Sequence, residues 1–220
     1  MLHRNITRNL GLIFLILTST VAVGQKATDT TQLETLFGKE NLRAQGYGSA
    51  QLGFSKLDET GVLLVVAEGG VIINRKIGVG ATVTGIVSSQ TTDIYYAAYD
   101  EETAAVVRGI YGGVKFEPLL KPHKLVHVGF PTVVGGGMLF YMTDRSNYVD
   151  TNGKYNRREI DSDAFFYIEP GAAIEFNITN FMRFELALTY RYTPGLSLNS
   201  TPDNGFNKVT TYINFKFGKF

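Results

Sequence analysis

The chain has 220 residues, of which 44% are hydrophobic and 19% charged, and its formal net charge at pH 7 is +1. A balance this close to neutral excludes the basic surface that nucleic-acid binding needs, so we expect no nucleic-acid partner. The absence of cysteine excludes disulfides, thiolate metal sites and lipid attachment to cysteine. The 15 Phe, 12 Tyr and 24 Gly, with no Trp, favour a β-rich chain in which glycine relieves crowding.

The first 24 residues have the three parts of a secretory signal peptide. Arg4 and Arg8 precede an apolar run at 10–23, and small residues lead up to Gly24. The alternative is an N-terminal anchor helix, but the run is shorter than the roughly 20 residues that a span needs. We expect a signal peptide at 1–24 with cleavage after Gly24. A polar periplasmic lead-in at 25–45 and a single domain at 46–220 should follow.

The domain consists of segments in which apolar and polar residues alternate. In the clearest of them, 182–192, Phe184, Leu186 and Leu188 share one parity, while Arg183 and Glu185 share the other. This strict period of two is typical of a β-strand with two unlike faces. The same pattern predicts eight strands, at 46–56, 62–73, 77–88, 104–116, 125–142, 164–178, 182–192 and 209–217.

The connections between these strands alternate in length. Those at 74–76, 117–124 and 179–181 are short, whereas those at 89–103, 143–163 and 193–208 are long; only 57–61 departs from the alternation. A closed up-and-down barrel places alternate connections at opposite rims, and outer-membrane barrels have short periplasmic turns and long extracellular loops. A soluble barrel such as a lipocalin gives no reason for loop length to differ by rim.

One face of every predicted strand is apolar and needs surroundings other than water, which a bilayer supplies. Large aromatic residues on this face lie towards the strand ends, as the interfacial girdles of a membrane barrel do. The expected girdle at the short-turn rim is Phe116, Phe130, Phe176, Phe184 and Phe217, and the one at the long-loop rim is Phe54, Phe140, Phe166, Tyr190 and Tyr192. Arg108 has the outward parity, and we expect its strand to protrude above the membrane.

The other face carries five carboxylates and four fixed cations, together with Gln51 and His127. Eight strands leave an interior that side chains fill, and a near balance of charge is what such an interior needs. We therefore expect a closed network of ion pairs and no pore. Its predicted members, beside Glu117, are Glu68, Lys115, Glu169, Glu175, Arg183, Glu185, Arg191 and Lys216.

The turn at 179–181 also predicts a register. Because like faces must pair across it, the turn must contain an odd number of residues, and its three residues allow residue numbers that sum to 360 to lie opposite each other. A slip of two residues would instead pair Glu175 with Arg183 and leave Glu169 facing Thr189. We choose the first register because it does not force Phe181 into a strand position on the crowded polar side. Glu169 then lies opposite Arg191, and Glu175 lies opposite Glu185. We expect Arg183 and Lys216 to relieve the repulsion between the last two carboxylates.

With these features the chain resembles the OmpA/OmpX-type eight-stranded outer-membrane barrels, especially the small outer membrane beta-barrel proteins of Bacteroidetes-like bacteria. The resemblance covers 46–220 and rests on the signal peptide, the eight segments, the sorted loops and the terminal Phe220. It implies an all-β, eight-stranded antiparallel up-and-down transmembrane β-barrel in a Gram-negative outer membrane. In that family the barrel assembly machinery reads a final strand that ends in an aromatic residue. One departure is that Phe220 has the parity of Lys216 and Gly218, not that of the outward-facing Phe215 and Phe217, so the last residues do not follow a regular strand.

The sequence does not favour an enzyme. The lipid A deacylase and palmitoyltransferase barrels resemble this chain in architecture, and they need a His with Ser and a carboxylate near the outer leaflet. His123 and His127 fall at the opposite rim, and we expect His127 to be a hydrogen-bonded interior residue. The run at 150–153 begins like a calcium loop, but the positions that follow lack oxygen ligands in order, so we interpret it as a turn. We expect no cofactor and no metal.

The long loops are the remaining candidates for function. Tyrosines in the second and third loops offer large contact area for a surface ligand, or else extend the outer girdle: Tyr95, Tyr96, Tyr99, Tyr148 and Tyr155. We expect a monomer with a structural or surface-interaction role, and outer-membrane lipid, the barrel assembly machinery and an unknown surface ligand as partners. The alternative is a narrow channel or transporter for small solutes, which planar-bilayer conductance would reveal.

Overall fold

The computed structural model describes residues 43–96, 101–143, 159–198 and 200–220. These residues form nine antiparallel strands. None of them belongs to a helix long and apolar enough to cross a membrane. The strands are β1 Ala44–Leu57, β2 Thr60–Ile73, β3 Ile77–Tyr96, β4 Glu101–Leu120, β5 Val126–Gly129, β6 Thr132–Thr143, β7 Glu159–Asn177, β8 Met182–Tyr190 and β9 Val209–Gly218.

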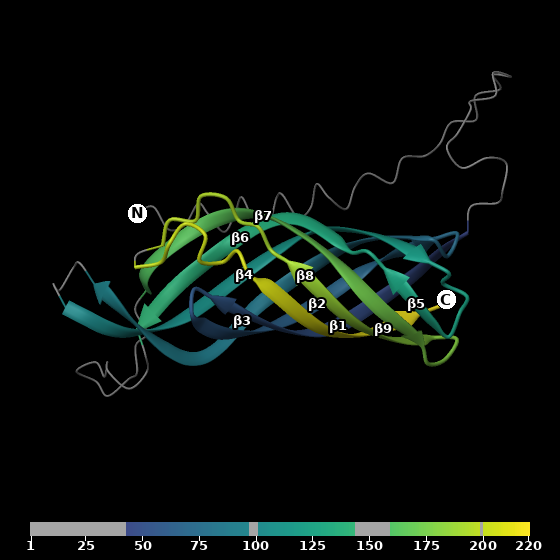
Figure 1. Cartoon of the computed structure of the whole chain (residues 1–220), viewed down its shortest axis with the longest axis horizontal. Helices are drawn as coiled ribbons and strands as arrows, with labels where there is room; N and C mark the ends of the chain where they lie inside the picture. The colour runs from purple at the N-terminus through teal and green to yellow at the C-terminus, as the bar shows by residue number, and fades with distance from the viewer. Residues whose placement is uncertain (1–42, 97–100, 144–158, 199) are drawn as a thin grey trace, which may run out of the picture. The chain divides into compact units, whose positions relative to one another are not determined.

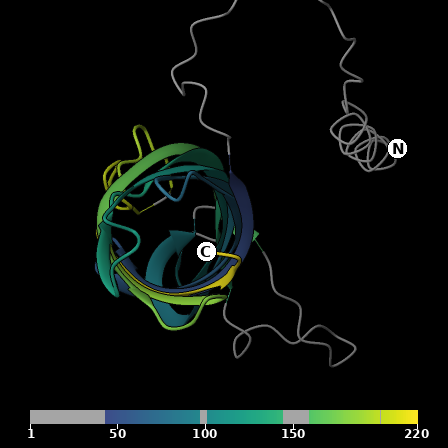
Figure 2. The same cartoon turned by 90° about the vertical axis from the view of Figure 1, so that its right-hand side faces the viewer.

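The strands close into a ring by pairing the first with the last. Gln51 of β1 lies opposite Asn214 of β9, and consecutive strands pair along the rest of the chain, except for β5 and β6. β5 and β6 both lie between β4 and β7. Together they occupy one strand position, so the ring has eight strand positions. Figure 2 shows the closed ring from the end at which the chain finishes. The predicted fold, an eight-stranded antiparallel up-and-down β-barrel, is confirmed.

The strand predicted at 125–142 is interrupted where Phe130 and Pro131 separate β5 from β6. Proline has no N–H to give to a strand ladder. The backbone polar groups around the break still find partners, because the Phe130 N–H donates to the carbonyl of Pro118 at 3.0 Å and that of Gly171 to the carbonyl of Pro131 at 2.8 Å. The prediction of one unbroken strand was therefore wrong, although its place in the barrel was right.

The loop predicted at 89–103 is mostly strand. β3 and β4 remain paired as far as Tyr96 opposite Glu101, with an irregularity between Val87 and Thr91. Their neighbours end earlier, β2 opposite Val87 and β6 opposite Ala105. The two strands therefore extend past the ring as a hairpin, at the left of Figure 1. The sequence shows no clear alternation here, because neither face of a protruding hairpin meets one uniform environment.

Arg108 lies near the base of this hairpin, opposite Val87 and Phe140. Its side chain is partly buried, and its Nη1 donates to the carbonyl of Val107 at 3.4 Å. Strand β4 runs beyond Arg108 by several residues, as expected from its charge on the outward face.

The two faces of the barrel agree with the predicted parity. Every residue of the two predicted aromatic girdles is exposed or half-buried, and every charged residue assigned to the inner face is buried. The register of β7 and β8 is confirmed from Gly171 opposite Thr189 to Asn177 opposite Arg183. An isolated bridge between Ile168 and Tyr192 continues it.

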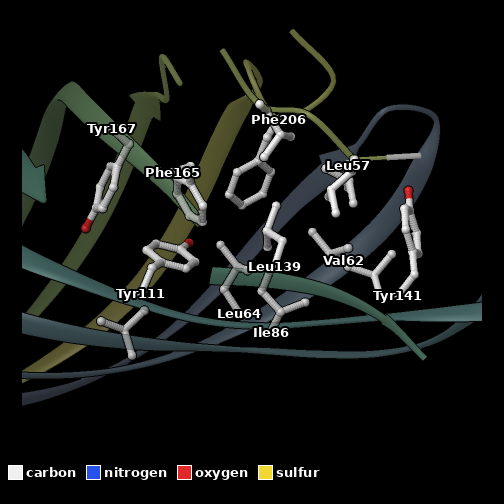
Figure 3. Packing of buried hydrophobic residues seen from close by; sticks show 14 of the residues in the cluster. Leu57, Val62, Leu64, Ile86, Tyr111, Leu139, Tyr141, Phe165, Tyr167 and Phe206 are labelled. Carbon is white, nitrogen blue, oxygen red and sulfur yellow. The ribbon is translucent and has the colours of Figure 1, made fainter. Parts of the chain in front are cut away.

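The interior at the long-loop end is apolar, a feature that the predicted network of ion pairs did not include. Leu64, Tyr111, Leu139 and Phe165 pack there with ring centroids of Tyr111 and Phe165 5.7 Å apart (Figure 3). The connection between β8 and β9, predicted as an extracellular loop, folds into this cluster. It buries Leu196, Leu198 and Phe206.

Hydrogen bonds fix this connection to the barrel. The Asp58 N–H donates to the carbonyl of Gly205 at 2.6 Å, and the hydroxyls of Tyr141 and Thr201 lie 2.6 Å apart. We call residues 193–198 and 200–208 the cap. It closes the long-loop end of the barrel with apolar side chains.

Gly137 illustrates how tightly the inner wall is packed. A Cβ added there would overlap the Cβ of Tyr111 and the carbonyl oxygen of Ile110, whereas a Cβ at Gly85 would meet nothing within 4 Å. We predict that Gly137→Ala lowers the free energy of unfolding by about 1–3 kcal/mol. The matched change Gly85→Ala should be neutral or stabilise by less than about 1 kcal/mol. Urea titration of protein refolded in lipid would measure both, and equal effects would contradict the packing.

Candidate functional site

The charged residues predicted for the interior come from five parts of the chain. Glu68 lies on β2, Lys115 and Glu117 on β4, Glu169 and Glu175 on β7, Arg183 and Glu185 on β8, and Lys216 on β9, while Arg191 follows β8. Each is at most 6% exposed. The structure brings them together in two groups, which lie between the apolar cluster and the short-turn rim.

The larger group is a continuous chain of ion pairs. Lys115 Nζ lies 3.2 Å from Glu68 and 3.3 Å from Glu117. Lys216 Nζ continues from Glu117 at 2.9 Å to Glu185 at 2.5 Å. Each lysine thus bridges carboxylates from different strands, so the group ties β2, β4, β8 and β9 together across the lumen.

Lys216 also separates two like charges that the register forces together. Glu175 and Glu185 are directly opposite each other on β7 and β8. Lys216 Nζ lies 3.4 Å from the first and 2.5 Å from the second. Glu175 receives two further contacts, from His127 Nε2 at 2.7 Å and from Arg183 Nη1 at 3.4 Å. Opposite charge within hydrogen-bond reach offsets the repulsion that two facing carboxylates would suffer.

The smaller group is the predicted pair Glu169–Arg191. Arg191 Nε donates to Glu169 at 2.8 Å, and the hydroxyls of Thr189 and Tyr212 donate to the same carboxylate at 2.6 and 2.9 Å. The Arg191 guanidinium lies 4.2 Å from the ring centroid of Phe206. This pair therefore joins the charged interior to the apolar cap.

Little space remains between these groups. A cavity of about 40 Å³ lies among Glu68, Tyr111, Lys115 and Glu169, room for only a few water molecules. Buried charges are tolerated only when each meets opposite charge and hydrogen-bond partners, and this packing supplies both. The arrangement can hold the wall rigid, because its ion pairs join strands on different sides of the lumen.

Several hydrogen-bond partners in the site were not predicted, although Gln51 had been placed on the inner face. The Tyr47 hydroxyl donates to Glu68 at 2.5 Å, Gln51 Nε2 donates to Glu68 at 2.6 Å, and Asn214 Nδ2 donates to Glu185 at 3.0 Å. All three share the inward parity of their strands, which is the signal that could have identified them. Phe206 had no such signal, because the cap has no period.

The other predicted candidates do not assemble into a site in the described residues. Tyr95 and Tyr96 end β3 opposite Glu102 and Glu101, and nothing of their side chains is described. Tyr99, Tyr148, Tyr155, the calcium-like run at 150–153 and the expected signal peptide at 1–24 lie outside the described residues. His123 is exposed and His127 is buried. No cluster of three or more His, Asp or Glu suited to a metal ion occurs in the part of the chain that is described.

Comparisons with known proteins return distant likenesses. No protein-family model and no curated protein matches the chain. The crystal structure of Neisserial surface protein A is similar with 10% identity and a TM-score of 0.49, over 82% of this chain and 100% of that chain. The crystal structure of Ail, the attachment invasion locus protein of Yersinia pestis, has 12% identity and a TM-score of 0.45, over 80% of this chain and 97% of that chain. Likenesses of this size do not identify a function.

The pair Glu169–Arg191 gives a direct test of the interior. We predict that Glu169→Ala and Arg191→Ala each lower the free energy of unfolding by about 3–5 kcal/mol, because each leaves a buried charge without its partner. The double variant should cost clearly less than the sum of the two. Refolding titrations of the four proteins would measure this.

The control pair is Lys56–Glu59, whose side chains are 57% and 82% exposed at a separation of 3.5 Å. The same double-mutant cycle there should give a coupling below about 1 kcal/mol. Additive effects at Glu169 and Arg191, equal to those at the exposed pair, would show that the buried pair is not energetically coupled.

Proposed function

We propose that the chain is an integral β-barrel protein of the bacterial outer membrane, with a structural or surface-interaction role at its long-loop rim. The observation that carries the proposal is the inversion of the usual burial pattern. Charged side chains are buried inside the ring, while large apolar side chains cover its outer wall, including Val83, Ile110, Val114, Val134, Phe166 and Leu188, each more than 40% exposed. A continuous apolar surface of this kind would aggregate in water.

The height of this surface fits a bilayer. On β7 the outward-facing Phe166 and Phe176 belong to the two aromatic girdles and lie ten positions apart (176 − 166). Ten residues of strand span about 33 Å, which a tilt of about 40° reduces to about 25 Å, the height of the apolar band in outer-membrane barrels. Aromatic residues at both edges suit the two interfaces.

The two rims support an orientation for the barrel. The short turns at 74–76 and 179–181 suit the periplasm, and the long connections together with the protruding β3–β4 hairpin suit the cell surface. A hairpin that extends beyond the membrane belt, and the loop tyrosines of the sequence, provide area for contact with a surface ligand. We place residues 1–24 as an export signal and 25–45 as a periplasmic lead-in.

At the level of family, we propose an OmpA/OmpX-type barrel of the Bacteroidetes-like kind, assembled through its C-terminal strand by the barrel assembly machinery. Because the ring closes within one chain, its wall needs no second copy, which supports a monomer. We propose a non-enzymatic role. The channel alternative gains no support, since ion pairs and the cap fill the lumen.

Whether the outer face contacts lipid can be tested by introducing one arginine at either of two depths in the apolar belt. Leu188 is 57% exposed in the middle of the belt, and Val209 is 55% exposed near the long-loop rim. If the belt meets lipid, Leu188→Arg should cost about 2–4 kcal/mol and Val209→Arg about 0–1 kcal/mol, because the cost of a cation falls towards the interface. Refolding into vesicles would measure both. Equal tolerance, with soluble protein recovered, would refute a lipid-facing belt.

The orientation can be tested with an epitope tag on intact cells. A tag at 151–153 should be labelled from outside, because this connection belongs to the long-loop rim. A tag at 74–76 should be labelled only after permeabilisation. The reverse result would invert the barrel.

A further inference from the structure

The short-turn rim of the barrel carries an uncompensated positive charge. Six exposed cations lie in or beside its turns and at the adjoining strand ends: Arg43, Arg75, Lys76, Lys121, Lys124 and Lys219. Within the described part of the chain, none of them is in an ion pair with a carboxylate. Among the described residues of β4 and β7, the carboxylates nearest to this rim are Glu117 and Glu175, and both are buried in ion pairs of the internal network.

The opposite rim has a different balance. Asp58, Glu59, Asp161, Asp163 and Asp203 lie there, together with Lys56 and Lys208. In the part of the chain that the structure describes, charge is therefore polarised along the barrel, with the basic end at the short turns. A single-sign ring next to an apolar belt is the pattern that attracts anionic headgroups at a membrane surface.

A cavity of about 300 Å³ opens within this basic rim. Arg75 from the β2–β3 turn, His123 from the β4–β5 turn and Arg183 from β8 line it together with Asn177, Asn180 and Phe220. No Asp or Glu side chain is among its lining residues. Two guanidinium groups that share one cavity repel each other, and an anion between them would remove that repulsion.

Arg183 supplies a second and independent indication of an anion. Its side chain is 2% exposed and meets Glu175 only through Nη1, at 3.4 Å. Its guanidinium lies 4.0 Å from the ring centroid of Phe220, while its buried Nε has no hydrogen-bond partner among the described residues. A buried donor without an acceptor is costly, and the side chain that carries it also lines the adjoining cavity, so the Arg183 guanidinium has hydrogen-bonding capacity that Glu175 does not use.

We infer that this cavity, lined by Arg75, His123 and Arg183, binds the headgroup phosphate of an anionic phospholipid in the leaflet at the short-turn rim. Guanidinium groups recognise phosphate oxygens through paired hydrogen bonds. The large apolar side chains of Leu125, Ile178 and Phe181 are exposed on the same turns, where acyl chains would lie. The inference rests on the proposed membrane location. The same chemistry would accept free phosphate, so a test must separate the two sources.

The test uses the full chain refolded into nanodiscs of phosphatidylcholine with one fifth phosphatidylglycerol, followed by gentle extraction and native mass spectrometry of the lipid that remains bound. We expect phosphatidylglycerol to be enriched about tenfold over its share of the bilayer. The double variant Arg75→Gln/His123→Gln should lower that enrichment at least fivefold. The matched control Lys76→Gln/Lys121→Gln removes two cations from the same rim outside the cavity and should stay within twofold of the unmodified protein.

Three results would overturn the inference. Equal loss in both double variants would mean diffuse attraction to the rim and no defined site. Absence of enrichment in the unmodified protein would mean no lipid site. Displacement of phosphatidylglycerol by millimolar inorganic phosphate, with equal phosphate binding in pure phosphatidylcholine discs, would assign the cavity to free phosphate. Failure to insert into any disc would refute the proposed function as well, whereas insertion without enrichment refutes only the lipid site.

Discussion

Pairing between β1 and β9 is the constraint on which the rest of the structure depends. Once these strands join, from Tyr47 opposite Gly218 to Phe54 opposite Thr211, the backbone of the barrel wall has partners on both sides. No sheet edge then faces the surroundings within the belt, which is what a chain needs where water is absent. Closure also fixes the inner radius, so the inward side chains must fill a space of set size.

That fixed space explains why the interior has two layers. In the short-turn half, many inward positions carry Glu, Lys, Arg and His, beside a small apolar cluster of Tyr47, Ile72 and Leu119. The charged side chains can be buried because Lys115 and Lys216 each contact more than one carboxylate. In the long-loop half the inward positions are Leu, Val, Tyr and Phe, and the cap adds Phe206 to them. Arg191 connects the layers, with its charge on Glu169 and its flat face on Phe206.

The two ends of the barrel differ in structure and in charge. The long-loop end carries the cap and the protruding β3–β4 hairpin. The hairpin extends past the ring and provides surface that other molecules could contact. The short-turn end is compact, basic and hollowed beside Arg183. Arg183 lines that hollow and also contacts Glu175. An anion in the hollow would therefore change the electrostatic surroundings of Glu175 and of the internal network.

The eight places in the ring, the two faces of the wall and the β7–β8 register are properties that the sequence determines by itself, although the break between β5 and β6 is not. The alternation of apolar and polar residues is local, so it shows within each strand which side chains point inward. The three-residue turn between two alternating strands favours the register that buries Glu169 with Arg191. What the tertiary structure alone decided are the contacts that depend on several strands at once. Lys216 meets Glu117 of β4, 99 residues away, through the stagger accumulated around the ring, which no single turn specifies. The cap and the contact of Phe220 with Arg183 also lack a sequence signal, because neither segment has a periodic pattern. Their positions depend on the space that the closed wall leaves free.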